Sequence, residues 1–299
     1  MLKIHPIAAI DIGSNAIRLL ISHVIEDSDT VHFRKASLIR VPVRLGHDVF
    51  IHGSIREEKI NKLITSCKAF YNLMQAYDVE QFRACATSAM REAANSREIL
   101  DRIKREAGID VEVITGEEEA QIIYSTHIER LLEKDKPSMY VDIGGGSTEI
   151  TFFKGLDVKA SRSFNLGTVR MLDEKVDPGL MDDLKSWLQK NSAGIKGLQT
   201  IGSGGTINKI SKMIPTRKKD GQIFSYHQFR EVYNLLKDLS VDERITRTGL
   251  GPDRADVVIP AAQIMLSVMK WSGSKSVMVP KFGLADGMVR LLFEQRVNA

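Results

Sequence analysis

Apolar residues form four short runs that are grouped in two pairs. The first pair covers residues 7–12 and 16–24, the second covers residues 139–143 and 149–153, and a glycine-containing segment separates the members of each pair. Apolar runs of this length that are bounded by turn residues are typical of buried β-strands. The pattern therefore predicts a strand–loop–strand unit in each half of the chain.

The two predicted units form an internal repeat. Their aspartates, Asp11 and Asp142, each stand directly before an Ile-Gly pair and lie 131 positions apart. This period is that of a whole domain, because solenoid and propeller repeats recur about every 20 to 50 residues. The sequence thus predicts a duplicated domain.

Helical periodicity alternates with strand-like runs in the rest of the chain. Apolar residues recur at helical spacing within residues 55–79, and Thr115 and Glu118 have the spacing of a capping box before another helix. Further helices are predicted at residues 95–107, 117–134, 179–189, 207–213, 226–239, 256–270 and 287–297, and further strands at 81–86, 111–114 and 197–201. This alternation indicates the α/β class.

A polar segment at residues 133–138 separates the two halves. Its length and its proline are typical of a connection between domains. We expect one domain at residues 1–133 and a second at residues 134–299, with the last helix packing back on the first domain. The 299 residues suit two domains, since a single core rarely grows beyond about 250 to 300 residues.

Composition excludes several classes of protein. No apolar run reaches the roughly 18 residues of a membrane span, and the N-terminus lacks a signal-peptide pattern, so a cytoplasmic location is expected. Cys67 and Cys85 belong to no cluster, and the seven histidines include no close pair, so a disulfide framework and a histidine-held metal are not indicated. The net charge of +4 permits a polyanionic ligand but does not indicate nucleic acid.

The glycine loops are candidate phosphate sites. Glycine exposes backbone N–H groups at close range, and an aspartate at the end of the preceding strand can hold Mg²⁺ directly or through water. Neither loop is a Walker A or a dinucleotide-binding sequence. Each could be a simple hairpin turn, but recurrence at one domain length favours a phosphate site. The predicted phosphate-binding residues are Gly13, Ser14, Asn15, Gly144, Gly145, Gly146, Ser147 and Thr148.

A third loop, at residues 201–206, follows a predicted strand and precedes a predicted helix. There Gly204 and Gly205 could present N–H groups to an anion at the start of the helix. An ordinary loop with an N-cap threonine is an equally good interpretation of this segment.

The ordered motifs AAIDIGSNAIRLLI, ATSAMREAAN, ITGEEEA, VDIGGGSTEI and GSGGT resemble those of the exopolyphosphatase and guanosine pentaphosphate phosphohydrolase (Ppx/GppA) family. The stretches VRLG, NLGTVRM and GPDRADVVIPA extend the resemblance over nearly the whole chain. It implies two duplicated ribonuclease H-like domains of the actin-like ATPase type, with an interdomain cleft. It also implies a phosphoanhydride hydrolase that uses Mg²⁺, and a possible homodimer.

The resemblance also implies roles for individual residues. Glu119 would be the base that activates water, and Arg91 would face the cleft and pair with phosphate oxygens. Asp142 and Glu149 would hold Mg²⁺ and position water, and Asp11 would share that task. Further candidates for phosphate contacts are Arg18 and Arg44. The pattern alone would make Glu119 an ordinary helix-start carboxylate and Arg91 a surface cation.

Two departures from the family pattern bear on the substrate. Many relatives have a GLREG-like sequence near the end, where this chain has Ala285 and Asp286, and longer relatives have a further C-terminal helical region. Inorganic polyphosphate is the first choice of substrate, and guanosine pentaphosphate is the alternative within the same chemistry. A nucleotide or alarmone sensor without turnover also fits the loops, whereas a sugar-kinase-like transferase or a filament protein fits the motifs less well.

Overall fold

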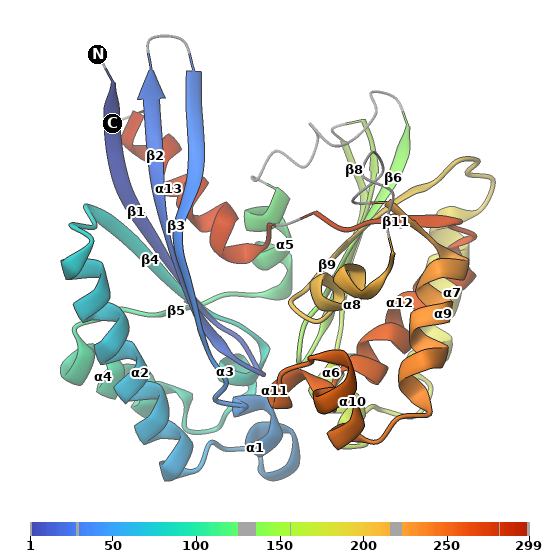
Figure 1. The fold of residues 1–299 in the computed structure, drawn as a ribbon, viewed down its shortest axis with the longest axis horizontal. Coiled ribbons are helices and arrows are strands. Elements are labelled where there is room, and N and C mark those ends of the chain that lie inside the picture. The colour runs from blue at the N-terminus through green and yellow to red at the C-terminus, as the bar shows by residue number, and fades with distance from the viewer. Residues whose placement is uncertain are drawn as a thin grey trace. The chain divides into compact units, whose positions relative to one another are not determined.

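The computed structural model describes residues 2–27, 30–124, 136–155, 157–215, 223–280 and 282–297. It contains two compact units, Met1–Thr126 with Phe282–Ala299, and His127–Lys281, each built around its own β-sheet (Figure 1). The predicted continuation of one helix to residue 134 and the predicted boundary after residue 133 lie outside the described residues.

The first unit has a five-stranded sheet with the order β3-β2-β1-β4-β5. β1, β2 and β3 are antiparallel neighbours, whereas β4 is parallel to β1 and β5 is parallel to β4. The bounds of these strands are β1 Lys3–Ile12, β2 Ile17–Asp27, β3 Thr30–Val41, β4 Gln81–Ala86 and β5 Glu112–Val113. The first predicted strand–loop–strand unit is thus the β1–β2 hairpin.

Helices cover both faces of this sheet. Alternate residues of β1, among them Ile10, share a core with Leu63 of α2 and Ile99 of α4, and α2 packs against α4. α13 packs against β1, β2, β4 and α5, so the last helix belongs to the first unit. The helices of this unit are α1 Leu45–His52, α2 Glu57–Ala76, α3 Ser88–Glu92, α4 Ser96–Ala107, α5 Gly116–Tyr124 and α13 Leu284–Val297.

The second unit repeats this sheet. Its strand order, β8-β7-β6-β9-β11-β10, begins with three antiparallel strands and continues with two parallel ones, as in the first unit, and adds β10 at the edge. The bounds of these strands are β6 Pro137–Ile143, β7 Thr148–Lys154, β8 Asp157–Phe164, β9 Gln199–Ser203, β10 Ile223–Ser225 and β11 Ser276–Met278. The α/β class and the duplication predicted from the two loops are confirmed.

α12 (Val258–Ser272) lies at the centre of the second core. Ile264, Met265 and Met269 are fully buried in it, and α12 packs against α6, α7, α8 and α9. A helix whose side chains are apolar around most of its circumference is expected to be buried on most sides. The remaining helices of the unit are α6 Thr168–Leu172, α7 Leu180–Ser192, α8 Ile207–Met213, α9 Tyr226–Lys237, α10 Val241–Thr248 and α11 Pro252–Ala255.

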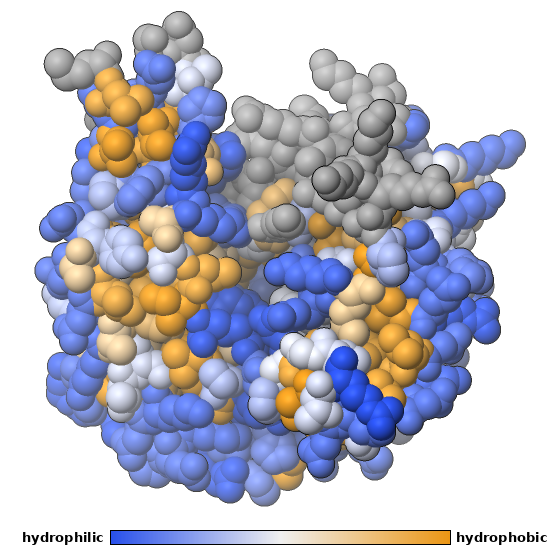
Figure 2. Space-filling view, in the orientation of Figure 1, coloured by the Kyte–Doolittle hydropathy of each residue, from blue (hydrophilic) through white to orange (hydrophobic). Residues whose placement is uncertain are grey.

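Some apolar side chains stay exposed near the N-terminal end of β1 and on the edge strand β3, and Figure 2 shows hydrophobic atoms in this region of the first sheet. Ile4 and Val31 are among them. The exposed charged residues Arg34 and Lys35 also lie on β3, and charged side chains along an edge strand hinder pairing with another chain. Among the described residues, no helix has the length and apolar character needed to cross a membrane.

Candidate phosphate loops and acidic site

The two glycine loops have the same local geometry. Each joins two antiparallel strands through four residues, 13–16 in the first unit and 144–147 in the second. Gly13 N donates to Ala16 O at 3.2 Å, and Gly144 N donates to Ser147 O at 2.9 Å. The same backbone hydrogen bond therefore closes both loops.

A following helix holds the carbonyl groups of each loop. Near the start of α1, Arg44 N donates to Asn15 O at 2.9 Å and Gly46 N donates to Ser14 O at 2.8 Å. A trans peptide points its carbonyl and its next N–H in opposite directions. The N–H groups that follow these carbonyls are therefore turned away from α1, as an anion-binding loop requires.

The second loop is held in a similar way at the start of α6. Thr168 N donates to Gly144 O at 3.0 Å, and Arg170 Nε donates to Gly146 O at 3.0 Å. The stretches VRLG and NLGTVRM, which carried part of the family resemblance, thus supply the segments that hold the two loops.

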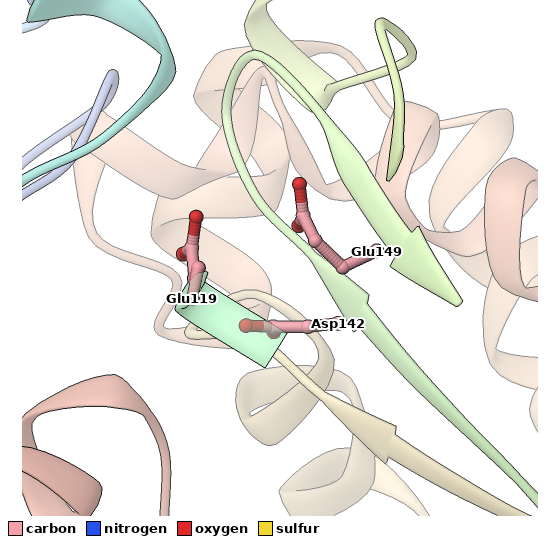
Figure 3. A group of neighbouring side chains, drawn as sticks. All are labelled: Glu119, Asp142 and Glu149. Carbon is pink, nitrogen blue, oxygen red and sulfur yellow. The ribbon is translucent and has the colours of Figure 1, made fainter. Parts of the chain in front are cut away.

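The second unit brings two acids together beside its loop. Asp142 near the end of β6 pairs in register with Glu149 near the start of β7, and their carboxylate oxygens lie within 4.8 Å of each other (Figure 3). Glu149 is 2% exposed and accepts a hydrogen bond from Ser163 Oγ at 2.8 Å, while Asp142 is 9% exposed. Two buried carboxylates at this distance repel each other unless a cation lies between them. Their hard oxygen atoms suit Mg²⁺.

Asp11 occupies the same register position in the first unit, but its neighbour differs. It pairs with Arg18, whose guanidinium donates a hydrogen bond to the Asp11 carboxylate. Asp11 is 5% exposed and belongs to no cluster of three potential metal ligands among the described residues. The Arg18 cation balances this buried carboxylate.

Glu118 and Glu119 lie next to each other at the start of α5 and have different surroundings. Glu118 and Thr115 form a capping box, with Thr115 N 2.7 Å from the Glu118 carboxylate and Glu118 N 3.1 Å from Thr115 Oγ1, as the spacing predicts. The hydrogen bond from the Thr115 backbone lowers the pKa of Glu118. Glu119, drawn in Figure 3, is half-buried, and its backbone N–H donates to Thr115 O at 3.0 Å.

Arg91, at the end of α3, lies near the same turn. Its guanidinium donates to Ile114 O at 2.7 Å, directly before the capping box of α5. The structure therefore places Arg91 beside the N-terminal end of the helix that carries Glu119.

The third loop lies beside the second one. Ser203 at the end of β9 pairs in register with Asp142, and a Cβ added to Gly204 would lie 2.5 Å from Ile143 O. Gly204 also has a φ of +116°, so both its conformation and its close approach to β6 require glycine. Gly205 is half-buried. The structure thus brings two of the three predicted loops to one end of the second sheet.

The predicted hydroxyl and amide donors differ in their surroundings. Thr148 is fully buried, and its hydroxyl donates to Leu166 O, so this group stabilises the loop from within the unit. Ser14 and Ser147 are buried, and Asn15 is half-buried.

Sequence patterns did not predict the residues that support these loops. Arg170 touches the second loop, Ser163 touches an acid of the site and Lys59 touches the turn before α1, while Asp48 accepts a hydrogen bond from Lys59. Arg170 could have been found, because it lies inside the NLGTVRM stretch that the resemblance already singled out. The other three lie outside every motif.

Comparison with known proteins decides the family. The sequence model of the Ppx/GppA phosphatase family matches residues 24–294, which is most of the chain. The chain belongs to this family. The resemblance to the Ppx/GppA family inferred from the motifs is therefore confirmed.

Individual relatives agree with this result. The Ppx/GppA chain is 26% identical over 296 residues to the bifunctional 3-dehydroquinate synthase/phosphatase of Fusobacterium nucleatum, and 27% identical over 301 residues to the guanosine-5'-triphosphate,3'-diphosphate pyrophosphatase of Photobacterium profundum. These matches cover 91% and 94% of the chain, but only 44% and 58% of the respective relatives.

A solved structure has the same fold. The crystal structure of an exopolyphosphatase from Cytophaga hutchinsonii superposes with a TM-score of 0.83 at 25% identity, and the match covers 97% of this chain and 98% of that one. The Ppx/GppA fold therefore extends along nearly all of the chain.

Proposed function

We propose that this Ppx/GppA protein hydrolyses the terminal phosphoanhydride bond of inorganic polyphosphate and releases orthophosphate. The observation that carries the proposal is the buried Asp142–Glu149 pair. It lies beside a glycine loop whose carbonyl groups accept hydrogen bonds from the start of α6. Hydrolysis of a phosphoanhydride needs N–H donors for the phosphate oxygens and acids that hold a cation and a water molecule. The family and the named exopolyphosphatase of the same fold support this substrate class.

Asp142 and Glu149 would hold Mg²⁺. The distance between their oxygens and their burial fit a small cation that prefers carboxylate and water ligands. When bound, the ion would neutralise charge on the phosphate oxygens. The Ser163 hydroxyl donates to one oxygen of Glu149 and so fixes the orientation of this carboxylate.

The two glycine loops would each bind phosphate oxygens of the substrate. Their outward N–H groups would donate to the phosphate oxygens, and they would do so without reorganisation because helix-start segments already fix the carbonyls. Gly204 and Gly205 would add donors beside the second loop.

Glu119 would act as the general base. In this step its carboxylate accepts a proton from water while the water oxygen attacks the terminal phosphorus in line with the leaving oxygen. Arg91 would pair with a phosphate oxygen through its remaining N–H groups and at the same time hold the start of α5 through Ile114 O.

A second substrate belongs to the same chemistry. Guanosine pentaphosphate also ends in a phosphoanhydride, and the relative named as a guanosine-5'-triphosphate,3'-diphosphate pyrophosphatase favours it. Binding of either compound without turnover would instead indicate a sensor.

Phosphate release distinguishes these functions. The wild-type protein is assayed with polyphosphate and with guanosine pentaphosphate, each with Mg²⁺ and with EDTA, beside Glu119→Gln and Glu118→Gln. Glu119→Gln is expected to lower kcat by about 10² to 10⁴, the usual contribution of a general base. Glu118→Gln is the matched control, because glutamine also completes a capping box.

Equal rates for Glu119→Gln and wild type would overturn the assignment of Glu119 as the base. Calorimetric binding of a substrate without phosphate release would indicate a sensor.

A further inference from the structure

The turn before α1 contains a residue in an unfavourable conformation. Arg44 has φ 57° and ψ 46°, in the left-handed region, where the Cβ of an L-residue meets the next carbonyl oxygen. Asparagine and glycine adopt this conformation more readily than arginine. A conformation of this kind persists only where its surroundings stabilise it.

The conformation of Arg44 positions the first phosphate loop. It places two donors, Arg44 N and Gly46 N, at 2.9 Å from Asn15 O and 2.8 Å from Ser14 O. α1 also approaches the loop closely, since a Cβ on Gly46 would lie 2.9 Å from Ser14 Cβ. Figure 1 shows α1 at the end of the first sheet where β1 turns into β2. The orientation of the loop therefore depends on the backbone at Arg44.

Three charged side chains hold this backbone in place. Lys59 Nζ on α2 donates to Arg44 O at 2.8 Å and to Asp48 Oδ1 at 2.6 Å. Asp48 is fully buried and also accepts hydrogen bonds from the Arg56 side chain at 2.9 and 3.1 Å and from Arg56 N at 3.0 Å. Asp48 thereby fixes Lys59, and Lys59 fixes the carbonyl of Arg44.

We propose that Asp48, Lys59 and Arg56 are positioning residues that act on the first phosphate loop through the left-handed backbone of Arg44. The proposal rests on the proposed function only in taking that loop as part of the substrate site. Among the described residues, the cluster reaches the turn at 44–46 through the hydrogen bond from Lys59 to Arg44 O, and its effect on the loop passes through that turn.

A comparison of glycine and alanine at position 44 distinguishes a positioning role of Lys59 from a general effect of Lys59 on stability. Glycine adopts the left-handed conformation without the Cβ penalty, whereas alanine keeps that penalty, and both remove the guanidinium group. If Lys59 acts by holding this conformation, its loss matters with alanine at 44 and is largely rescued by glycine. If Lys59 only stabilises α1 and α2, the residue at 44 makes no difference.

The experiment is a double-mutant cycle on the full chain. Lys59→Met is introduced into the Arg44→Ala and Arg44→Gly backgrounds, and KM and kcat are measured for polyphosphate with Mg²⁺. Lys68→Met in both backgrounds is the control, because Lys68 is a lysine of the same helix that pairs at the surface with Glu106. The exchange of the Gly46 amide hydrogen is followed in the same variants as a readout that needs no substrate.

With alanine at 44, Lys59→Met is expected to raise KM about 5- to 30-fold, the range that corresponds to the left-handed penalty, and to change kcat less. With glycine at 44 the rise is expected to be below about twofold, and the Gly46 amide is expected to stay protected. Asp48→Asn is expected to follow Lys59→Met in both backgrounds.

An equal rise in KM in the two backgrounds, or equal Gly46 exchange in all variants, would overturn the positioning role. Failure of the proposed function gives a different result. In that case the wild-type protein releases no phosphate from either substrate, while the exchange of the Gly46 amide still responds to Lys59→Met and is still rescued by glycine at 44.

Discussion

Asp142 lies directly opposite Glu149 across the β6–β7 pair, at the position where Asp11 lies opposite Arg18 across the β1–β2 pair. The two hairpins have the same loop length and the same closing hydrogen bond, so the backbone of the repeat is kept while its charge is changed. In the first unit the aspartate is neutralised by an arginine. In the second unit a second acid stands at the register position of that arginine, and we propose this second hairpin as the one that holds the metal ion.

The acidic pair should cost stability when no cation is bound. Like charges directly opposite each other on neighbouring strands are destabilising, so Glu149→Gln is expected to raise the unfolding free energy in EDTA by about 0.5 to 1 kcal/mol. The same change is expected to abolish most of the phosphate release. Thermal unfolding in EDTA measures the stability, the rise of Tm in Mg²⁺ measures ion binding to the folded wild type, and a phosphate assay measures the loss of release.

Ser163→Ala is the companion variant for this test. It removes the hydroxyl that donates to Glu149 but keeps both charges, so no gain of stability is expected in EDTA. A Glu149→Gln protein that is less stable than wild type in EDTA would contradict the idea that the two carboxylates repel each other.

The ion pair of the first unit should behave in the opposite way. Arg18→Met leaves the buried Asp11 carboxylate without its cation and is expected to cost about 2 kcal/mol, less than a fully buried pair because Arg18 is 31% exposed. The double variant Asp11→Asn with Arg18→Met is expected to regain part of this loss, since no charge is then left unbalanced. Urea unfolding of the two single variants and the double variant gives the coupling energy. Additive losses would show that the pair does not act as a unit.

The loops could be predicted from sequence because their chemistry is local. A glycine two residues after an aspartate, at the end of an apolar run, indicates both the turn and the kind of ligand that it can bind. The capping box of Thr115 and Glu118 is set by a spacing of three residues. This local sequence pattern is the same around Asp11 and around Asp142. What separates Asp11 from Asp142 is the residue across the strand pair, and its position depends on register.

The parts that the sequence did not predict are exposed or short. β3 and β8 are edge strands of their sheets. Most residues of β3 and half of those of β8 are exposed, so these strands lack the apolar alternation that predicts a strand. α1 has only eight residues, and its link to the first loop passes through backbone atoms of Arg44 and Gly46. Backbone contacts of this kind do not depend on which side chains are apolar, so hydrophobic periodicity does not predict them.

The cluster around Asp48 makes stability depend on pH. Burial raises the pKa of this carboxyl, but hydrogen bonds from Arg56 and Lys59 outweigh burial and hold the pKa well below its ordinary value. A lowered pKa in the folded state stabilises the protein above the ordinary aspartate pKa of about 3.9, and that contribution is lost as the pH falls below it. Asp48→Asn is therefore expected to be less stable than wild type at neutral pH, by about 2 kcal/mol.

The difference between Asp48→Asn and wild type is expected to shrink as the pH is lowered from 7 to 3, because below about pH 3.9 the Asp48 carboxyl takes up a proton in the unfolded wild type while it stays ionised in the folded one, which favours unfolding. Urea unfolding across this range measures the difference. Asp110→Asn is the matched control, since Asp110 pairs with Lys104 at the surface, where both side chains are exposed. A constant difference at every pH would mean that Asp48 acts by shape and not by charge.

The contact between α13 and α5 links the end of the chain to the predicted base. A Cβ on Gly287 would lie 2.0 Å from Ile122 O, so α13 can pack on α5 only with glycine at this position. Gly287→Ala is expected to push the helices apart, to lower the unfolding free energy by about 2 to 3 kcal/mol, and to lower kcat because α5 carries Glu119.

Met288→Leu is the control variant. It changes a neighbouring buried residue of α13 at nearly constant volume and is expected to cost less than about 1.5 kcal/mol with little effect on kcat. Thermal unfolding and phosphate release are compared in both variants. Unchanged stability of Gly287→Ala would show that α13 can shift without loss, and reduced stability with unchanged kcat would separate the packing of α5 from the reaction.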